Sequence, residues 1–187
     1  MKKSIFLLLT ILFAALGVGA QEWNDSIRIT YKLHGQTRRF NTVFRRLAGG
    51  GAEMSWEIER NLKMWRGTYT MTPHAVKEGT AMSFIMPEDG KHVTLPDNET
   101  FAILSQKAYN ILRDSGRMEW GGATFRLDSI ANERLYATDT IEGARITVLD
   151  NQGFPLVTSM QDNPLEINWT ATLISRATHQ RIKSRRR

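Results

Sequence analysis

Residues 95–116 read LPDNETFAILSQKAYNILRDSG, and this stretch carries the strongest helical pattern in the chain. Asp97 stands where an N-cap residue is expected, because its carboxylate can accept hydrogen bonds from the free backbone amides that begin a helix. Gly116 is typical of the left-handed residue that ends one. One side of the stretch is apolar at helical spacing, and it consists of Phe101, Leu104, Ala108, Ile111 and Leu112. The stretch therefore predicts one long helix over about residues 97–114.

Apolar and polar residues alternate along most of the remaining chain, which is typical of β-strands with one buried face. Segments with this pattern occur before and after the predicted helix, at residues 27–33, 40–44, 54–58, 69–71, 82–86, 118–120, 125–127, 135–141, 144–149, 155–160 and 165–173. Because the segments before the helix follow one another directly, they indicate an antiparallel meander rather than β-α-β units.

These patterns predict an α+β fold that is mainly antiparallel β. We expect a curved sheet or half-barrel of about 8–10 strands, with the long helix packed on its concave face. A closed lipocalin-like barrel and a two-sheet sandwich are the alternative arrangements of the same strands.

Residues 1–20 have the pattern of a signal peptide, with Lys2 and Lys3, an apolar run over 5–16, and small residues at 18–20. The apolar run is too short to span a bilayer comfortably, so we expect no integral membrane segment after cleavage. The chain contains no Cys, which excludes a lipid-modified N-terminus, and export without disulfides is ordinary for a bacterial envelope protein. The expected location is therefore periplasmic or extracellular, without a lipid anchor.

The basic residues are concentrated at the two ends of the chain. Of 25 Lys and Arg residues, two lie in the predicted signal peptide and five in residues 181–187, which leaves 18 against 19 Asp and Glu in residues 21–180. A body without excess positive charge argues against nucleic-acid binding. We expect a single β-rich domain over residues 21–175, followed by a basic, disordered tail over 176–187.

No catalytic or metal-binding motif is present. The four histidines lie far apart in the sequence, and without Cys or a Gly-x-Ser-x-Gly turn no nucleophile is indicated. The one acidic concentration could form a cation site, but a turn and a helix cap explain its members more simply. Its members are Glu88, Asp89, Asp97 and Glu99. We expect no catalytic residues, no metal, no cofactor and no enzyme activity.

Aromatic and methionine side chains are the stronger functional signal, because soft side chains of this kind suit a pocket for an apolar ligand. We predict that an apolar or lipid-like ligand binds between sheet and helix. The candidate ligand-binding residues are Trp56, Tyr69, Met71, Met82, Phe84, Phe101, Leu104, Trp120 and Trp169. The alternative is a structural or protein-interaction component of the envelope with a fully packed core, which would bind an envelope protein partner.

The predicted order of elements resembles that of the half-barrel proteins of the bacterial envelope, which include the periplasmic lipoprotein carriers. The shared features are a signal peptide, a long antiparallel meander, one helix and further strands. Residues 87–100 and the Trp-containing strands are also similar to uncharacterised small secreted proteins of Bacteroides-like bacteria. The resemblance to the carriers implies apolar-ligand binding on the concave face, whereas the second resemblance implies no activity.

Overall fold

The structure is a computed structural model that describes residues 23–33 and 35–174. The predicted signal peptide (1–20) and basic tail (176–187) lie outside these residues. Within the described part, no helix is both long enough and apolar enough to cross a membrane.

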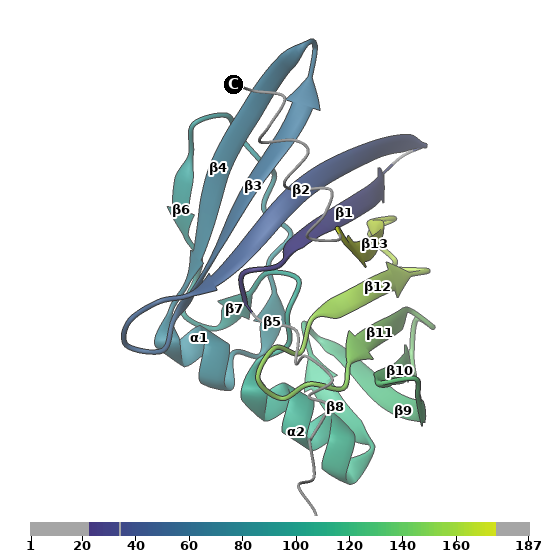
Figure 1. The fold of residues 1–187 in the computed structure, drawn as a ribbon. Coiled ribbons are helices and arrows are strands. Elements are labelled where there is room, and N and C mark those ends of the chain that lie inside the picture. Colours follow the sequence, from purple (N-terminus) through teal and green to yellow (C-terminus); the bar gives the residue numbers. More distant parts are fainter. Residues whose placement is uncertain (1–22, 34, 175–187) are drawn as a thin grey trace, which may run out of the picture.

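Eleven strands form one large, open sheet (Figure 1). In chain order they are β1 (Ser26–Leu33), β2 (Gln36–Arg46), β3 (Ala52–Arg60), β4 (Lys63–Met71), β6 (His92–Thr94), β8 (Arg117–Trp120), β9 (Ala123–Ala131), β10 (Arg134–Asp139), β11 (Arg145–Leu149), β12 (Val157–Gln161) and β13 (Asn168–Leu173). Across the sheet the order is β6-β4-β3-β2-β1-β13-β12-β11-β10-β9-β8. All pairs are antiparallel except β4 and β6, so the prediction of a mainly antiparallel fold is confirmed. The sheet does not close into a barrel, and its strands outnumber the predicted 8–10.

The remaining elements of the described residues are two helices and a small parallel pair of strands. They are α1 (Pro73–Glu78), α2 (Gln106–Ser115), β5 (Ala81–Met82) and β7 (Glu99–Thr100). In Figure 1 they gather at the lower end of the sheet, where α2 packs against α1, β8 and β9.

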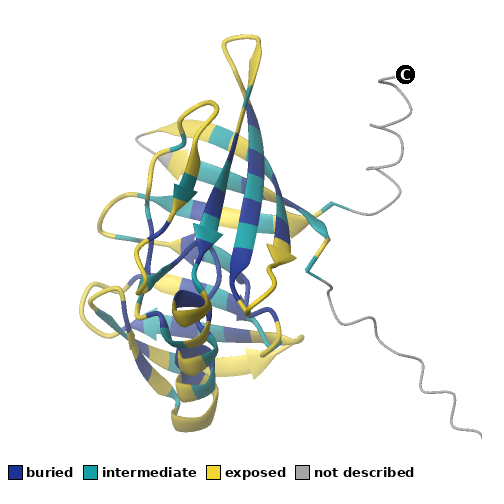
Figure 2. Ribbon diagram, turned by 90° about the vertical axis from the view of Figure 1, so that its left-hand side faces the viewer, coloured by how far each residue is buried: buried dark blue, intermediate teal, exposed yellow. Residues whose placement is uncertain are grey.

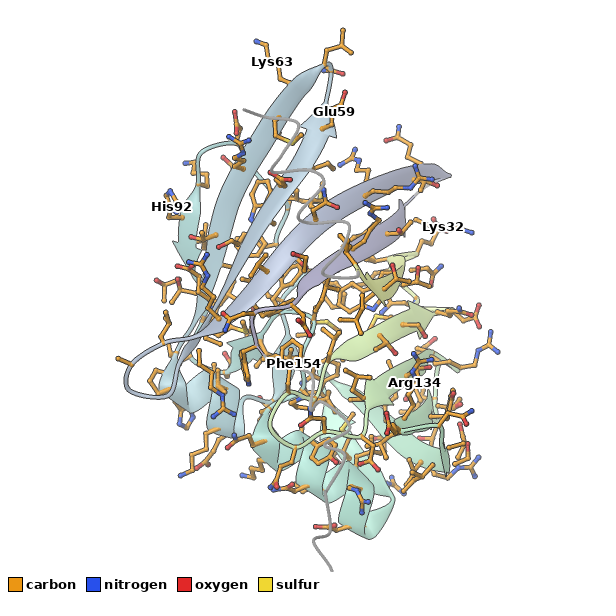
Figure 3. The ribbon with its side chains drawn as sticks, viewed as in Figure 1. Lys32, Glu59, Lys63, His92, Arg134 and Phe154 are labelled. Atoms are coloured by element: carbon orange, nitrogen blue, oxygen red, sulfur yellow. The ribbon has the colours of Figure 1, made fainter. Side chains whose placement is uncertain are left out.

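One face of the sheet carries the hydrophobic core. In β3, Ala52, Met54, Trp56 and Ile58 are buried, whereas the residues between them are half-buried, and the same alternation appears along other strands (Figure 2). Phe154 lies inside the molecule, while Lys32 and Lys63 point outward (Figure 3). The period-2 patterns of the sequence therefore identify the inward face correctly.

The predicted helix over 97–114 is wrong for residues 97–105. α2 begins at Gln106, and the hydroxyl of Ser105 caps it by accepting a hydrogen bond of 3.1 Å from the amide of Ala108. Asp97 instead accepts a hydrogen bond from the Thr72 hydroxyl at the start of α1. The helix ends at Gly116 in the left-handed conformation (φ 72°), as predicted.

Residues 100–105, here called the strap, cross the inner face of the sheet. Thr100 is the last residue of β7, and residues 101–105 are irregular apart from a single β-bridge between Ile103 and Leu156. All six are buried, whereas a helix with one apolar stripe exposes its other side. The amide of Phe101 donates to Met71 Sδ at 3.3 Å, and the carbonyl of Ala102 accepts from Val157 N at 2.8 Å. These bonds to both halves of the sheet replace the expected helical ones.

The position of α2 also differs from the prediction. The helix lies at the β8–β9 edge and contacts α1, so the strap rather than a long helix crosses the middle of the concave face. Leu112 is fully buried, but Ile111, which we expected on the buried stripe, is 41% exposed. The buried stripe was assigned with Phe101 and Leu104 as helical residues. Because α2 begins only at Gln106, its buried side is instead formed by Ala108, Tyr109 and Leu112.

Candidate functional site

A narrow cleft, here called the inner cleft, lies between the core face of the sheet and the chain that covers it. Its sheet side is formed by β1, β2, β3 and β4, and the lining residues there are Ile29, Tyr31, Arg38, Phe40, Thr42, Met54, Trp56 and Tyr69. The other side is formed by Phe84, Ile85, Met86, Pro87, Phe101 and Ile167. Almost the whole lining is apolar, which suits a hydrocarbon better than a polar solute.

Residues 83–90, here called the flap, cover the cleft without regular secondary structure. The flap is held at its ends, since Ser83 N donates to Thr100 O at 2.8 Å and Asp89 Oδ1 accepts from Arg66 N at 3.0 Å. Within the described part of the chain, residues 84–87 make no hydrogen bond. The strand predicted at 82–86 is therefore wrong after Met82, because these residues pair with no neighbouring strand.

Two side chains that line the cleft have hydrogen-bond donors without a partner among the described residues. Trp56 and Tyr69 are 3% and 2% exposed, and neither the indole N–H nor the phenol oxygen makes a hydrogen bond in the part of the chain that the structure describes. Trp120 Nε1 and Trp169 Nε1 are unpaired in the same way. A buried polar group without a partner costs about 1–3 kcal/mol, so each one calls for a physical explanation.

Both tyrosines of the cleft are neutral at physiological pH. Burial raises the pKa of Tyr69 to about 12, and the negative charge of Glu88 acts in the same direction. Burial also raises the pKa of Tyr31 well above its ordinary value, with a further contribution from Tyr69. Tyr69 is therefore available as a hydrogen-bond donor rather than as an anion.

Two further polar groups of the cleft, those of Thr42 and Arg38, have partners. The Thr42 hydroxyl donates to Ile27 O at 3.0 Å. Arg38, the one cation among the lining residues, is half-buried, and its Nη2 donates to Gln36 Oε1 at 3.2 Å. Arg38 was not predicted as a site residue. Because it lies two residues from Phe40 in β2, the strand alternation places both on the inward face and could have identified it.

The cleft is small in this conformation. Its volume is about 60 Å³, whereas a single water needs about 10–15 Å³. The present space therefore accommodates a few waters or a short piece of hydrocarbon, and a longer chain requires the flap to move.

The predicted site residues do not form one group. Trp56, Tyr69, Phe84 and Phe101 line the inner cleft. A second cleft of about 470 Å³ is lined by Met82 and Trp120, with Phe84 shared between the two clefts. The second cleft is also lined by the polar residues Asp139, at the end of β10, and Glu142 and Asn163, which lie outside the strands.

The other three predicted residues line neither cleft. Met71 and Leu104 are buried where the strap meets the sheet, and the Met71 sulfur accepts from Phe101 N. Trp169 packs against Tyr31 and Phe101 with ring centroids 5.2 and 6.3 Å apart. Met71 and Trp169 thus contact Phe101, which lines the inner cleft, without lining the cleft themselves.

Several lining residues were missed, although their alternation with predicted ones marks them. Met54 is two residues from Trp56, and Ile29 and Tyr31 alternate along β1. Met86 alternates in the same way with Phe84, whereas Ile85 lies between the two and had no such signal.

Three of the four acidic residues that raised the cation-site alternative have separate structural partners. Asp89 accepts from Arg66 N, Asp97 from Thr72, and Glu88 lies 3.8 Å from Lys91 Nζ. Among the described residues, no group of three or more His, Asp or Glu side chains is arranged to hold a metal ion.

Comparisons of the chain with models of protein families, with curated proteins and with solved structures find no match. What the cleft does must therefore be inferred from its own residues.

Proposed function

We propose that this protein is a non-enzymatic, exported component of the bacterial envelope that binds an apolar or lipid-like ligand in the inner cleft. The observation that carries the proposal is an almost wholly apolar lining, covered by a flap whose residues 84–87 make no hydrogen bond in the described part of the chain. Export is proposed from the signal-peptide pattern of residues 1–20.

Burial of hydrocarbon supplies the binding free energy. Each buried methylene contributes about 0.8 kcal/mol, and several of them offset the cost of association. The aromatic rings and Met54 and Met86 adapt to chains of different shape, because thioethers are flexible and polarisable.

Ligand uptake requires the flap to open. Because residues 84–87 give up no hydrogen bond in the described part of the chain when they move, the opening exposes mainly Phe84 and Ile85. Segments with few such bonds open at a lower free energy than the rest of a fold. Met86 is already 56% exposed, so its displacement costs little apolar burial.

The small volume favours a second candidate function. About 60 Å³ is well below the roughly 300–1,000 Å³ of ordinary ligand pockets. If the flap does not open, the protein is a structural or protein-interaction component of the envelope with a packed interior.

Two measurements distinguish the ligand-binding function from the structural or protein-interaction role. One is displacement of an environment-sensitive fluorescent fatty acid, and the other is native mass spectrometry of gently purified protein. We expect the wild-type protein to bind the probe and to retain a lipid. Met86→Glu should weaken binding about tenfold or more, because it places a charge at the edge of the apolar cleft.

Ile130→Glu is the matched control, since Ile130 is 47% exposed on β9 and does not line the inner cleft. It should leave the affinity for the probe unchanged. Absence of probe binding and of co-purified lipid would rule out the ligand-binding function and leave the second candidate.

A further inference from the structure

We propose that the ligand of the inner cleft carries a neutral hydrogen-bond acceptor, the carbonyl group of an acyl ester or amide, which receives the N–H of Trp56 and the O–H of Tyr69. This inference rests on the proposed function. Its basis is that both side chains line the cleft, are almost completely buried, and have unpaired polar atoms among the described residues.

The two donors are held next to each other by the sheet. Trp56 lies on β3 opposite Gly67 of β4, and Tyr69 is two residues further along β4 on the same face. Their ring centroids are 5.9 Å apart. An ester offers two oxygen atoms, so a single group of this kind can accept from both donors.

The position of the Trp56 indole requires a glycine at residue 67. A Cβ atom at residue 67 would lie 2.5 Å from Trp56 Cζ2 and 2.5 Å from Lys91 O, closer than any side chain tolerates. Gly67 therefore leaves the space that the Trp56 ring occupies inside the cleft. A core that only needed apolar volume would not require a buried indole N–H at this place.

The acceptor is neutral because of its surroundings. Near Trp56 and Tyr69 the cleft is lined by Met54 and Phe101, and burying a carboxylate among such groups without a cation is strongly unfavourable. Arg38, the cation of the lining, is half-buried and accessible from solvent. A charged end of a ligand would therefore bind near Arg38, and its carbonyl group would accept hydrogen bonds from Trp56 and Tyr69.

The test compares a fatty acyl methyl ester with an alkane of the same number of heavy atoms, each displacing the fluorescent fatty acid. The wild-type protein should prefer the ester. Tyr69→Phe removes one oxygen atom and no protein hydrogen bond, so it should fold normally. It should reduce the preference for the ester over the alkane about five- to tenfold, as the loss of one hydrogen bond does.

Tyr136→Phe, on β10 and outside the inner cleft, is the matched control and should retain the full preference. Trp56→Phe is a second variant, expected to act like Tyr69→Phe. If the wild-type protein binds the ester and the alkane equally, or if the preference survives in both variants, the polar subsite is refuted while the proposed function stands. If the wild-type protein binds neither compound, the proposed function itself fails.

Discussion

The hydroxyl group of Tyr109 in α2 donates a hydrogen bond of 2.5 Å to Asp150 Oδ1, directly after β11. Arg113, one turn further along the helix, donates to both carboxylate oxygens at 2.8 and 3.3 Å. Tyr109 is 4% exposed. The helix is therefore attached to the sheet by a polar contact as well as by its apolar side.

Removing the carboxylate should destabilise the protein. Asp150→Ala leaves the buried Tyr109 hydroxyl without its acceptor, and we expect the free energy of unfolding to fall by about 1–3 kcal/mol. Denaturant unfolding measures this loss. Asp114→Ala, at an exposed position of α2, is the control and should cause no loss; equal effects of both substitutions would contradict the assigned role.

The same carboxylate should make stability depend on pH. The hydrogen bond from Arg113 is the largest cause that lowers the pKa of Asp150 below its ordinary value. A lowered native pKa contributes stability above the unfolded pKa of about 3.9, and this contribution is lost as the pH falls through the native pKa. Melting temperatures of the wild-type protein and Asp150→Asn should therefore differ at pH 6, and the difference should shrink as the pH falls from about 4 through the lowered native pKa. A difference that is independent of pH would refute this.

Two neighbouring residues of α2 should respond very differently to truncation. Leu112 is completely buried, so Leu112→Ala should cost on the order of 2–5 kcal/mol. Ile111 is 41% exposed, and Ile111→Ala should cost well under about 1 kcal/mol. Chemical denaturation of the two variants tests the orientation of the helix, which would be wrong if Ile111→Ala were the more destabilising change.

The hairpin between β3 and β4 should be stabilised by a glycine. Its turn contains Asn61 and Leu62 with φ of 52° and 60°, and Leu62 is 94% exposed. Such turns favour Asn-Gly, because a side chain in the left-handed region is strained. Leu62→Gly should therefore raise the free energy of unfolding by about 0.5–1 kcal/mol.

The control for this prediction is Leu165→Gly, at an exposed leucine that is not in the left-handed region. It should give no gain in a thermal melt. A gain of similar size at both positions would show that loss of an exposed leucine, and not relief of backbone strain, is responsible.

The strand content of the fold could be predicted because its signal is local. The alternation of Met54, Trp56 and Ile58 in β3 shows which side chains face inward, and the structure buries these three. The pairing of β1 with β13, by contrast, joins residues such as Ile29 and Ala171. Nothing in a local pattern indicates that partner.

The start of the helix was misassigned because the cap was placed at Asp97, whereas Ser105 caps α2 in the structure. Asp97 and Ser105 both have side chains that suit an N-cap. The choice depends on residues 100–105, whose backbone bonds to distant segments such as Val157. Tertiary contacts therefore overrode a local helical signal.

The candidate site was predicted in part for the same reason. Trp56 and Tyr69 lie on regular strands, and the alternation located them. That their polar atoms are unpaired depends on every group around them, including the irregular flap. This property could be recognised only from the assembled structure.

The strap has a consequence for the mechanics of the open sheet. β4 and β12 are five strand-to-strand steps apart, roughly 24 Å when measured along the sheet. Yet Phe101 is bonded to Met71 of β4, and the next residue, Ala102, to Val157 of β12. Consecutive Cα atoms are only about 3.8 Å apart, so the sheet must bend until its two halves meet at this point. An open sheet has no closed ring of hydrogen bonds that sets its curvature. In this protein the strap joins the two halves of the sheet and so sets the curvature. The resistance of the sheet to flattening therefore depends on the strap.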